Sequence, residues 1–265
     1  MQAMKNQRRL AMGIEYDGSR YNGWQYQPHA PSVQEQLNIA ISSVADQSIT
    51  CTGSGRTDTG VHARGQVAHF DTQAERSSRA WLLGINSNLP DDINLLWIKE
   101  VDAEFHARYS AVKRIYRYSI LNRPVRSALA RQRAWWIRQP LDVTAMAAAA
   151  RCLLGQHDFS SFRASGCQSH SPVRNMLHID VTLKRDWLFI DCEANAFLHH
   201  MVRNIVGSLV DIGRGDQPVE WLHALLEARD RKLAGITAPA TGLVLSWIQF
   251  PAHFGIEDVN VKNCN

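Results

Sequence analysis

Apolar residues in the first hundred positions alternate between the spacing of helices and that of strands. Between positions 33 and 46 they recur every three or four residues, directly after a capping box formed by Ser32 and Glu35, and this pattern predicts a helix. Short apolar runs bounded by glycine, proline or aspartate predict strands. In chain order, the predicted elements are a strand over 10–16, the helix over 33–46, strands over 49–52 and 66–71, a helix over 78–87 and a strand over 93–101.

The second half of the chain repeats this order of elements. A strand over 111–121 places Tyr116, Tyr118 and Ile120 on one face. The predicted elements that follow are a helix over 143–154 capped by Asp142 and ended by Gly155, a hairpin of strands over 175–183 and 187–193, a helix over 199–212 with one buried stripe, a helical segment over 218–227 and a strand over 243–250. Both halves match the split βαβ pattern.

We therefore predict an α+β fold of two ferredoxin-like (βαββαβ) units, whose mainly antiparallel sheets flank a central basic active-site cleft. No residue-level repeat relates the halves, so this duplication rests on the order of elements. The predicted domains are an N-terminal α+β domain over 1–107 and a C-terminal α+β domain over 108–265 that completes the cleft.

Composition narrows the class of protein. With 265 residues, 45% of them hydrophobic and 20% charged, the chain resembles soluble globular proteins, and its apolar runs are much shorter than the roughly 20 residues of a membrane span. The N-terminus has no apolar segment of signal-peptide length. Five scattered cysteines without a CxxC pair suggest neither a disulfide framework nor a zinc site. We expect a cytoplasmic protein without membrane attachment.

Positive charge is concentrated in one part of the chain. The overall net charge is only +4, yet the segment from Phe105 to Leu141 holds nine lysines and arginines, no acidic residue, and several tyrosines and tryptophans. A solvated charged surface is the commoner meaning of such a run. Arginine interleaved with aromatic rings, however, suits a polyanion that also offers flat bases for stacking, so this basic band predicts contact with nucleic acid.

The most unusual stretch is the loop over 53–65, GSGRTDTGVHARG, which contains Asp58. A lone aspartate before glycine usually caps a turn. An aspartic protease would need a second DTG or DSG, which the chain lacks, and Arg56 would favour full ionisation over a shared proton. A phosphate-binding loop would need Lys-Ser/Thr where Val61-His62 stands. Four glycines beside Arg56, His62 and Arg64 exceed what a connector needs, and they favour a site where a planar ligand approaches the backbone.

Several segments together resemble one enzyme family. The loop GSGRTDTGVHARGQVAHF, the segments YDGSRYNGWQ, VQEQL, FHARYSAVKRIYRYSI and DFSSFRA, and the helix NAFLHHMVRNIVGSLVDIG are similar to the tRNA pseudouridine synthase A family and lie in order over most of the chain. The resemblance implies conversion of uridine to pseudouridine at positions 38, 39 and 40 of the anticodon stem-loop of tRNA. Because the uracil is only detached at N1 and rejoined through C5, no cofactor or metal is expected. The implied partners are tRNA and a second copy of the chain.

The resemblance also implies roles for individual residues. Asp58 is the nucleophile, which attacks either the ribose C1′ or the uracil C6, and Arg203 keeps it ionised. Tyr116 packs on the flipped uracil and assists proton removal, and Arg56 enters the stem or clamps a phosphate. Without the resemblance, Arg203 would be an ordinary polar-face arginine and Tyr116 a core aromatic. The implied tRNA-binding residues are Arg56, Arg76, Phe105, His106, Arg108, Tyr109, Tyr116, Gly166, Cys167, Gln168, Ser169 and His170.

Adjacent His199 and His200 are expected to point in different directions on a helix, which argues against a metal site. The competing class of function is a non-catalytic RNA-binding protein, because ferredoxin-like units often bind RNA through a sheet face. That alternative leaves the glycine-rich Asp58 loop without a purpose.

Overall fold

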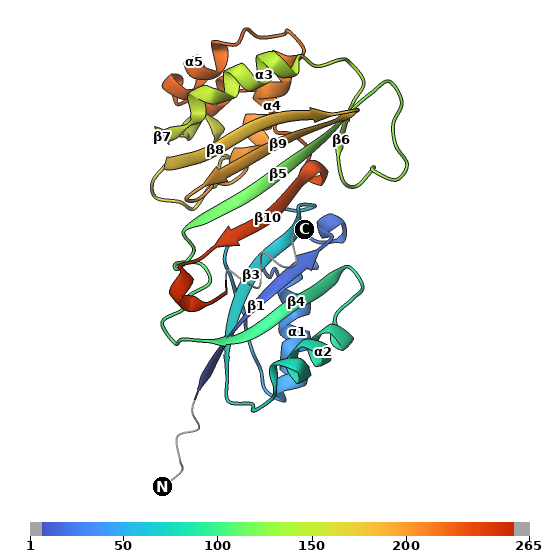
Figure 1. Cartoon of the computed structure of the whole chain (residues 1–265), viewed down its shortest axis with the longest axis vertical. Helices are drawn as coiled ribbons and strands as arrows, with labels where there is room; N and C mark the ends of the chain where they lie inside the picture. The colour runs from blue at the N-terminus through green and yellow to red at the C-terminus, as the bar shows by residue number, and fades with distance from the viewer. Residues whose placement is uncertain (1–6, 257–265) are drawn as a thin grey trace. The chain divides into compact units, whose positions relative to one another are not determined.

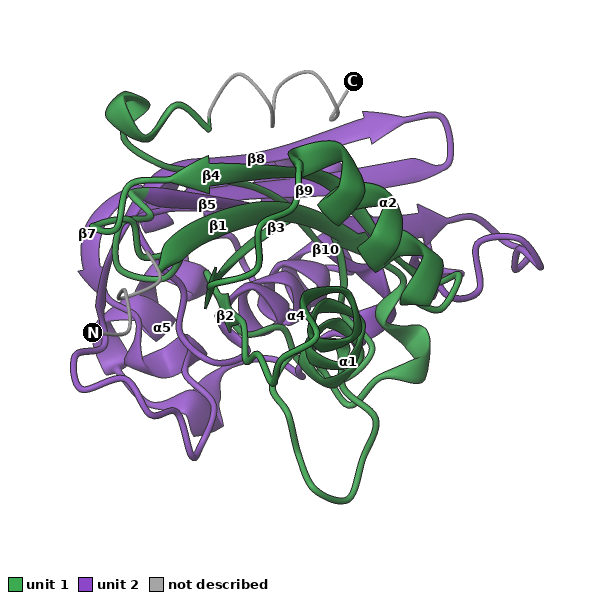
Figure 2. Ribbon diagram, turned by 90° about the horizontal axis from the view of Figure 1, so that it is seen from below, with its two compact units in different colours: residues 1–112, 245–265 green, residues 113–244 purple. Residues whose placement is uncertain are grey.

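The computed structural model describes residues 7–256, which divide into two compact units (Figure 1, Figure 2). Of these residues, 7–112 and 245–256 form unit 1, and 113–244 form unit 2. Each unit combines helices with a largely antiparallel sheet, so the predicted α+β class is confirmed.

Unit 1 contains the predicted sequence of strands and helices. Its elements are β1 (Arg8–Tyr16), α1 (Val33–Ala45), β2 (Thr52–Gly53), β3 (His62–Thr72), α2 (Ser78–Asn88) and β4 (Ile93–Val101), followed after unit 2 by most of β10 (Leu243–Gln249). The strands β4, β1 and β3 pair antiparallel in that order, and β2 pairs antiparallel with β3. Helices α1 and α2 pack together and cover one face of this sheet (Figure 1).

Side-chain caps explain where α1 begins. The hydroxyl oxygen of Ser32 accepts a hydrogen bond from the backbone N–H of Glu35 at 3.3 Å, which confirms Ser32 as the residue that caps the helix. The helix ends at Ala45 because Asp46 adopts a left-handed conformation with φ of 54°. The helix predicted over 33–46 is therefore confirmed to within one residue.

The strands on either side of the Asp58 loop differ from the prediction. The strand expected over 49–52 is reduced to Thr52–Gly53, because the backbone N–H groups of Ile49 and Cys51 donate to side chains of α1 instead of a neighbouring strand. Conversely, β3 begins at His62, four residues before the predicted start at Gln66. Gly65 permits this extension, since a Cβ there would lie 2.6 Å from the carbonyl oxygen of Ser246.

Unit 2 is built on an antiparallel hairpin that the sequence predicts. Its strands β8 (Val173–Lys184) and β9 (Trp187–Ala194) join through Arg185 and Asp186, with Arg185 in a left-handed conformation at φ 57°. The sheet order is β5 (Lys113–Asn122), β9, β8 and β7 (Gly155–Asp158), and β6 (Trp135–Ile137) runs parallel to β5. Helices α3 (Val143–Ala150), α4 (Met201–Gly213) and α5 (Trp221–Ala228) pack on one face (Figure 1).

The first helix of unit 2 is shorter than predicted, and two short strands are additional. The Oδ1 atom of Asp142 accepts from the N–H of Ala145 at 2.9 Å, which confirms the predicted cap. The helix then tightens into a 3-10 turn over Arg151–Leu153. Gly155, with φ of 94°, opens β7 and does not end a helix. The strands β6 and β7 are not predicted from the sequence, because runs of three and four residues are too short to show a period.

Helix α4 is buried far beyond the single apolar stripe that was predicted. Asn204, Gly207 and Ser208 are buried as well, because the segment over 231–238 crosses their face. A Cβ on Gly207 would lie 1.7 Å from the carbonyl oxygen of Ile236. The absence of a side chain at Gly207 therefore allows this segment to lie directly on the helix.

The two adjacent histidines do not lie on the helix, contrary to prediction. Helix α4 begins at Met201, and His200 precedes it in a left-handed conformation with φ of 60°. The rings of His199 and His200 pack with their centroids 4.0 Å apart, so they do not point in different directions. The prediction failed because it extended the helical period into the turn before the helix.

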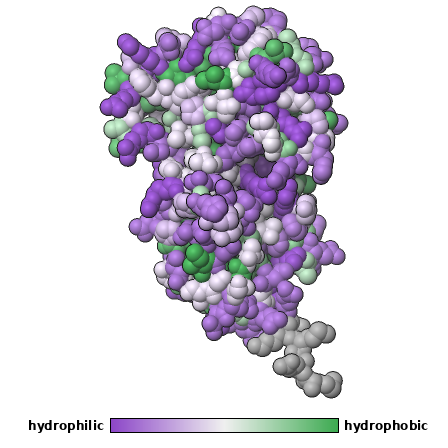
Figure 3. Space-filling model, turned by 180° about the vertical axis from the view of Figure 1, so that it is seen from behind, coloured by the Kyte–Doolittle hydropathy of each residue, from purple (hydrophilic) through white to green (hydrophobic). Residues whose placement is uncertain are grey.

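None of the described helices combines the length and apolar composition that crossing a bilayer requires. Figure 3 shows a face on which hydrophilic residues predominate and hydrophobic ones are scattered in small groups.

Candidate active site

The loop between β2 and β3 carries Asp58, and backbone hydrogen bonds hold the chain at Thr57 and at Asp58. The N–H of Trp24 donates to the carbonyl oxygen of Thr57 at 3.0 Å, and the N–H of Val61 donates to that of Asp58 at 3.1 Å. The hydroxyls of Thr57 and Tyr16 form a buried hydrogen bond of 2.8 Å. The side chain of Asp58 is half-buried. This loop therefore presents its carboxylate from a fixed position.

Two motifs that are separate in the sequence meet beneath Asp58. Gly23 has φ of 91°, and a Cβ at this position would lie 2.4 Å from the carbonyl oxygen of Thr57. A Cβ on Gly18 would lie 2.0 Å from the carbonyl oxygen of Val61. Glycines of the YDGSRYNGWQ segment thus allow the Asp58 loop to lie directly on it, which is the close backbone approach that glycine permits.

Arg56 is bonded to residues that the sequence analysis did not single out. Its Nε donates to Oε1 of Gln25 at 3.1 Å, and Nε2 of Gln25 donates to Oε1 of Gln34 at 2.9 Å. Both glutamines lie in quoted segments, GWQ and VQEQL, so the resemblance was the signal that could have identified them.

His62 supports the loop from its far end. The ring is buried, and its Nδ1 lies 3.1 Å from both the N–H nitrogen of Gly18 and the Oδ1 of Asp17. Arg64, two residues on, is exposed on β3. His62 thus has a structural role in the turn, whereas the sequence analysis counted it among the polar groups of the site.

The turn over 105–110 combines a buried anchor with an exposed ring. Phe105 is fully buried against Phe250 and Phe254, with centroids 5.2 Å away in each case. In contrast, Tyr109 is 76% exposed, and the guanidinium of Arg108 lies 5.7 Å from its ring centroid. The turn therefore presents a flat ring and a cation to solvent. Arg76 is also exposed, on the segment between β3 and α2.

Two histidines brace this turn. His106 packs between His69 and Tyr109, with centroid distances of 4.8 and 4.3 Å. Nδ1 of His69 accepts a hydrogen bond from the N–H of Ala107 at 3.2 Å, so the ring is bound in its neutral form. Burial, together with the nearby charges of His106 and Arg9, lowers the pKa of His69 to about 4.

This depressed pKa predicts an acid-sensitive fold. The unfolded chain takes up a proton at His69 near pH 6.5, and the folded chain does so only near pH 4. The contribution of His69 to stability is therefore fully present above pH 6.5 and is lost as the pH falls toward 4. Between pH 7 and 5 this group alone should lower the free energy of unfolding by about 2 kcal/mol. Denaturant titrations at pH 7 and pH 5 measure this change in the free energy of unfolding.

The matched variant is His69→Asn, whose side-chain oxygen can still accept from the N–H of Ala107 but does not titrate. Its loss of stability between pH 7 and 5 should be smaller than that of the wild type by about 2 kcal/mol. Equal losses in the two proteins would show that His69 is not the group that makes the stability depend on pH.

In unit 2, Tyr116 and Arg203 are both held in place. Tyr116, on β5, is 9% exposed and packs edge-on against Phe197, with centroids 5.1 Å apart. Nε of Arg203 donates to the carbonyl oxygen of Ala238 at 2.8 Å, and the N–H of Ala238 donates to the carbonyl oxygen of Arg203 at 3.1 Å. Arg203 is therefore a fixed, half-buried cation and not a solvated polar-face arginine.

The segment Gly166–His170 forms a turn around Arg163. Gly166 has φ of 80°, and Nη2 of Arg163 donates to the carbonyl oxygens of Cys167 and Ser169 at 2.8 and 2.6 Å. Burial acts to raise the pKa of the Cys167 thiol, but hydrogen bonds from the backbone and from Arg163 outweigh it, and the pKa lies below its usual value. The side chains of Gln168 and His170 are exposed.

The basic band is less uniform than the sequence suggests, because β9 and its turn supply acidic partners. Lys113 pairs with Glu193 at 2.6 Å, and Arg117 forms two bonds with Asp191 at 2.7 and 2.8 Å. Arg123 lies 3.7 Å from Asp186. These three positive charges are therefore compensated across the sheet, and only part of the band remains as a surplus for a polyanion.

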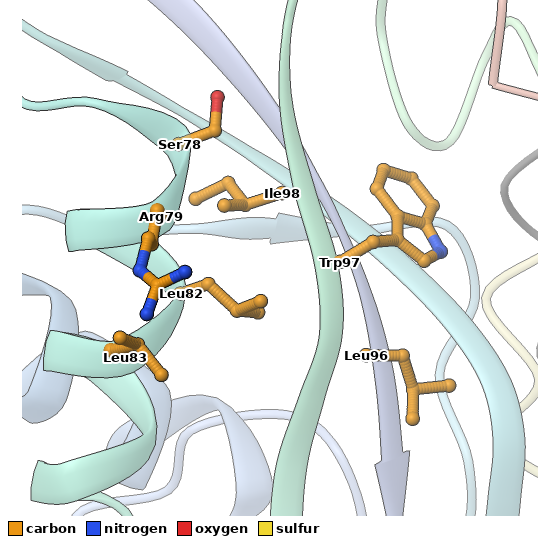
Figure 4. Close-up of a pocket in the computed structure, with 7 residues that line it drawn as sticks. All are labelled: Ser78, Arg79, Leu82, Leu83, Leu96, Trp97 and Ile98. Carbon is orange, nitrogen blue, oxygen red and sulfur yellow. The ribbon is translucent and has the colours of Figure 1, made fainter.

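Within a single unit, the site shows no cluster of metal ligands, and a hollow in unit 1 lies away from it. Taken unit by unit, the described residues gather no three His, Cys, Asp or Glu side chains that could hold a metal ion. A hollow of about 460 Å³ lies between α2 and β4, lined by Ser78, Arg79, Leu82, Leu83, Leu96, Trp97 and Ile98 (Figure 4). None of the predicted site residues lines this hollow.

A family model and individual relatives of this chain indicate the same protein family. A family model described as tRNA pseudouridine synthase matches residues 12–110 and 149–251. A tRNA pseudouridine synthase A of Hydrogenovibrio crunogenus is 53% identical over 250 residues, covering 94% of this chain and 95% of the relative. Proteins of the same name from Klebsiella pneumoniae and Nitrosococcus oceani are 53% and 50% identical over 248 residues, with 94% of this chain covered and 92% and 96% of the relatives.

Proposed function

This chain belongs to the tRNA pseudouridine synthase family, and we propose that it converts uridine to pseudouridine at positions 38, 39 and 40 of the anticodon stem-loop of tRNA. The observation that carries the proposal is the half-buried carboxylate of Asp58 on a loop whose backbone is bonded on both sides. A reaction that needs one carboxylate in a fixed place, and no redox or hydrolytic chemistry, suits this arrangement.

The proposed reaction uses Asp58 as the nucleophile. Its carboxylate attacks the ribose C1′ or the uracil C6, the N1–C1′ bond breaks, and a new bond joins C1′ to C5. The proton on C5 leaves, N1 gains a proton, and the carboxylate is released unchanged. The product is an isomer of the substrate, so the atoms balance without any co-reactant.

Arg203 and Tyr116 are proposed to assist this step. An ionised carboxylate that loses contact with water is stabilised by a nearby cation, and we assign this role to Arg203. Its hydrogen bond to Ala238 supports the assignment, because the guanidinium is oriented before substrate binds. Tyr116 is proposed to pack on the flipped uracil and to assist removal of the C5 proton.

Residues of each unit are proposed to contact tRNA. Arg56 would enter the stem or hold a phosphate when the target base leaves its stack. Arg76 and the 105–109 turn would contact tRNA, with Arg108 and Tyr109 meeting the RNA directly and Phe105 supporting the turn from below. In unit 2, we assign tRNA contact to the Gly166–His170 turn.

The finer points of architecture also belong to this proposal. We infer a ferredoxin-like arrangement for unit 1, supported by the antiparallel strand order β4, β1, β3, β2 with both helices on one face. We further propose that the enzyme acts as a cytoplasmic homodimer and uses no metal.

The test is pseudouridine formation in an unmodified tRNA transcript labelled with tritium at C5 of uridine. Purified protein should release tritium and leave pseudouridine at positions 38–40, and a transcript with cytidine at these positions should release none. A protein that binds this transcript without releasing tritium would be the non-catalytic RNA-binding alternative.

A further inference from the structure

A chain of side-chain hydrogen bonds connects the core of unit 1 with the exposed guanidinium of Arg56. Gln34, on the first turn of α1, is only 7% exposed, and its Nε2 donates to the carbonyl oxygen of Cys51 at 2.8 Å. Its Oε1 accepts from Nε2 of Gln25 at 2.9 Å, and Oε1 of Gln25 accepts from Nε of Arg56 at 3.1 Å. We call Gln34 and Gln25 together the glutamine relay.

The backbone fixes the direction of this relay. The NH2 group of Gln34 donates to the carbonyl oxygen of Cys51. Its amide oxygen accepts from the N–H of Tyr26 at 2.9 Å. A flipped amide would place donor against donor and acceptor against acceptor. Because Gln34 can offer only its oxygen, Gln25 must turn its own NH2 group toward Gln34. The remaining oxygen of Gln25 then faces Arg56, whose guanidinium can only donate.

The backbone around the relay is also bound to the nucleophile loop. The N–H of Gln34 donates to the carbonyl oxygen of Trp24 at 3.0 Å, and the N–H of Trp24 donates to the carbonyl oxygen of Thr57 at 3.0 Å. The first-turn N–H of α1, which has no partner within the helix, is satisfied in this way. Because Gln25 directly follows Trp24, these bonds fix its position relative to Arg56 and Asp58, the two neighbours of Thr57.

We propose that Gln25 and Gln34 are positioning residues for Arg56, and that they orient its guanidinium before tRNA arrives so that it can hold the target base outside the stem. This inference rests on the role proposed above for Arg56. A long arginine side chain loses conformational freedom when it becomes ordered on RNA, and a preformed hydrogen bond reduces that loss. The bond to Nε is suited to the purpose because it fixes the plane of the guanidinium.

The main test is the single-turnover rate of pseudouridine formation with saturating enzyme. Gln25→Ala should lower this rate about tenfold, because a displacement of about 1 Å in a positioned group has effects of this order or larger. The Kd for tRNA should stay within about twofold. Gln25→Glu should restore only part of the rate, since its carboxylate still accepts from Nε of Arg56 but cannot donate to Oε1 of Gln34.

A double-mutant cycle separates positioning from general damage. In an Arg56→Ala background, the additional change Gln25→Ala should leave the rate unchanged, because the group that it orients is gone. If Gln25→Ala lowers the rate by the same factor with and without Arg56, the relay proposal is wrong. If Gln25→Ala has no effect while Arg56→Ala slows the reaction, the relay fails and the proposed function stands. If Arg56→Ala has no effect, the proposed role of Arg56 fails, and the relay proposal with it.

The structure also offers a matched control for Gln34. Asn38, one turn further along α1, accepts from the N–H of Cys51 at 2.9 Å, so Gln34 and Asn38 hold the same residue from the same helix. Gln34→Ala and Asn38→Ala should therefore lower the denaturation midpoint to a similar extent. Only Gln34→Ala should also slow the single-turnover reaction, and equal slowing by both variants would overturn the proposal.

Discussion

Changing Asp58 to asparagine is expected to reduce pseudouridine formation by at least a factor of about 1,000, with tRNA affinity nearly unchanged. Asparagine has the same shape as aspartate but is not a nucleophile, so the bond to the ribose or uracil cannot form. The loop should keep its conformation, because the backbone hydrogen bonds of Thr57 and Asp58 remain available after the substitution. Tritium release from C5-labelled transcript measures the rate, and filter binding measures the affinity.

Thr59→Ala is the neighbouring control. Thr59 is exposed on the same loop, so its loss should alter the rate by less than about threefold. A rate for Asp58→Asn above one tenth of the wild-type value would exclude Asp58 as the nucleophile. Loss of both tRNA binding and cooperative unfolding would instead mean that the substitution disrupts the loop.

Adding one methyl group to α4 at Gly207 is expected to destabilise the protein by about 3 kcal/mol or more. In most helices a change from glycine to alanine is favourable by up to about 1 kcal/mol. Here the new Cβ would lie 1.7 Å from the carbonyl oxygen of Ile236, which is backbone and cannot rotate away. The segment over 231–238 would have to leave α4, together with its hydrogen bonds to Asn204 and Ser208.

The matched variant is Gly84→Ala in α2. A Cβ there would lie 3.1 Å from a methyl group of Val44, which can shift, so its effect should be within about 1 kcal/mol of zero. Urea denaturation of both variants gives the comparison. Equal stability of Gly207→Ala and Gly84→Ala would mean that the 231–238 segment does not lie tightly on α4.

Local sequence signals were sufficient to predict the elements whose boundaries depend on nearby residues. The capping box of Ser32 and Glu35 located α1, and the polar turn over Lys184-Arg185-Asp186 located the hairpin, because both signals act over a few positions. The early start of β3 and the burial of α4 depend on Ser246 and Ile236, which are far away in the chain. No periodicity in a single segment reports such contacts.

The same distinction applies to the candidate site. The glycine-rich loop with Asp58 was recognisable, because permissive glycines beside charged residues are unusual in a connector. The basic band was overestimated, because the acids that pair with Lys113 and Arg117 come from a strand distant in sequence. Gln25 and Gln34 were quoted only as parts of motifs, since a neutral amide shows its purpose only when its partners are known.

The chain leaves unit 1 at Val112 and returns to it at Leu245, and this path has a consequence for synthesis on the ribosome. The N–H of Val112 donates to the carbonyl oxygen of Gln249 at 2.9 Å, and Phe105 is covered by Phe250 and Phe254. Because translation proceeds from the N-terminus, these covering residues emerge only after all of unit 2. A nascent chain can therefore complete unit 2 first, while the turn that carries Phe105 waits for the end of translation to become buried.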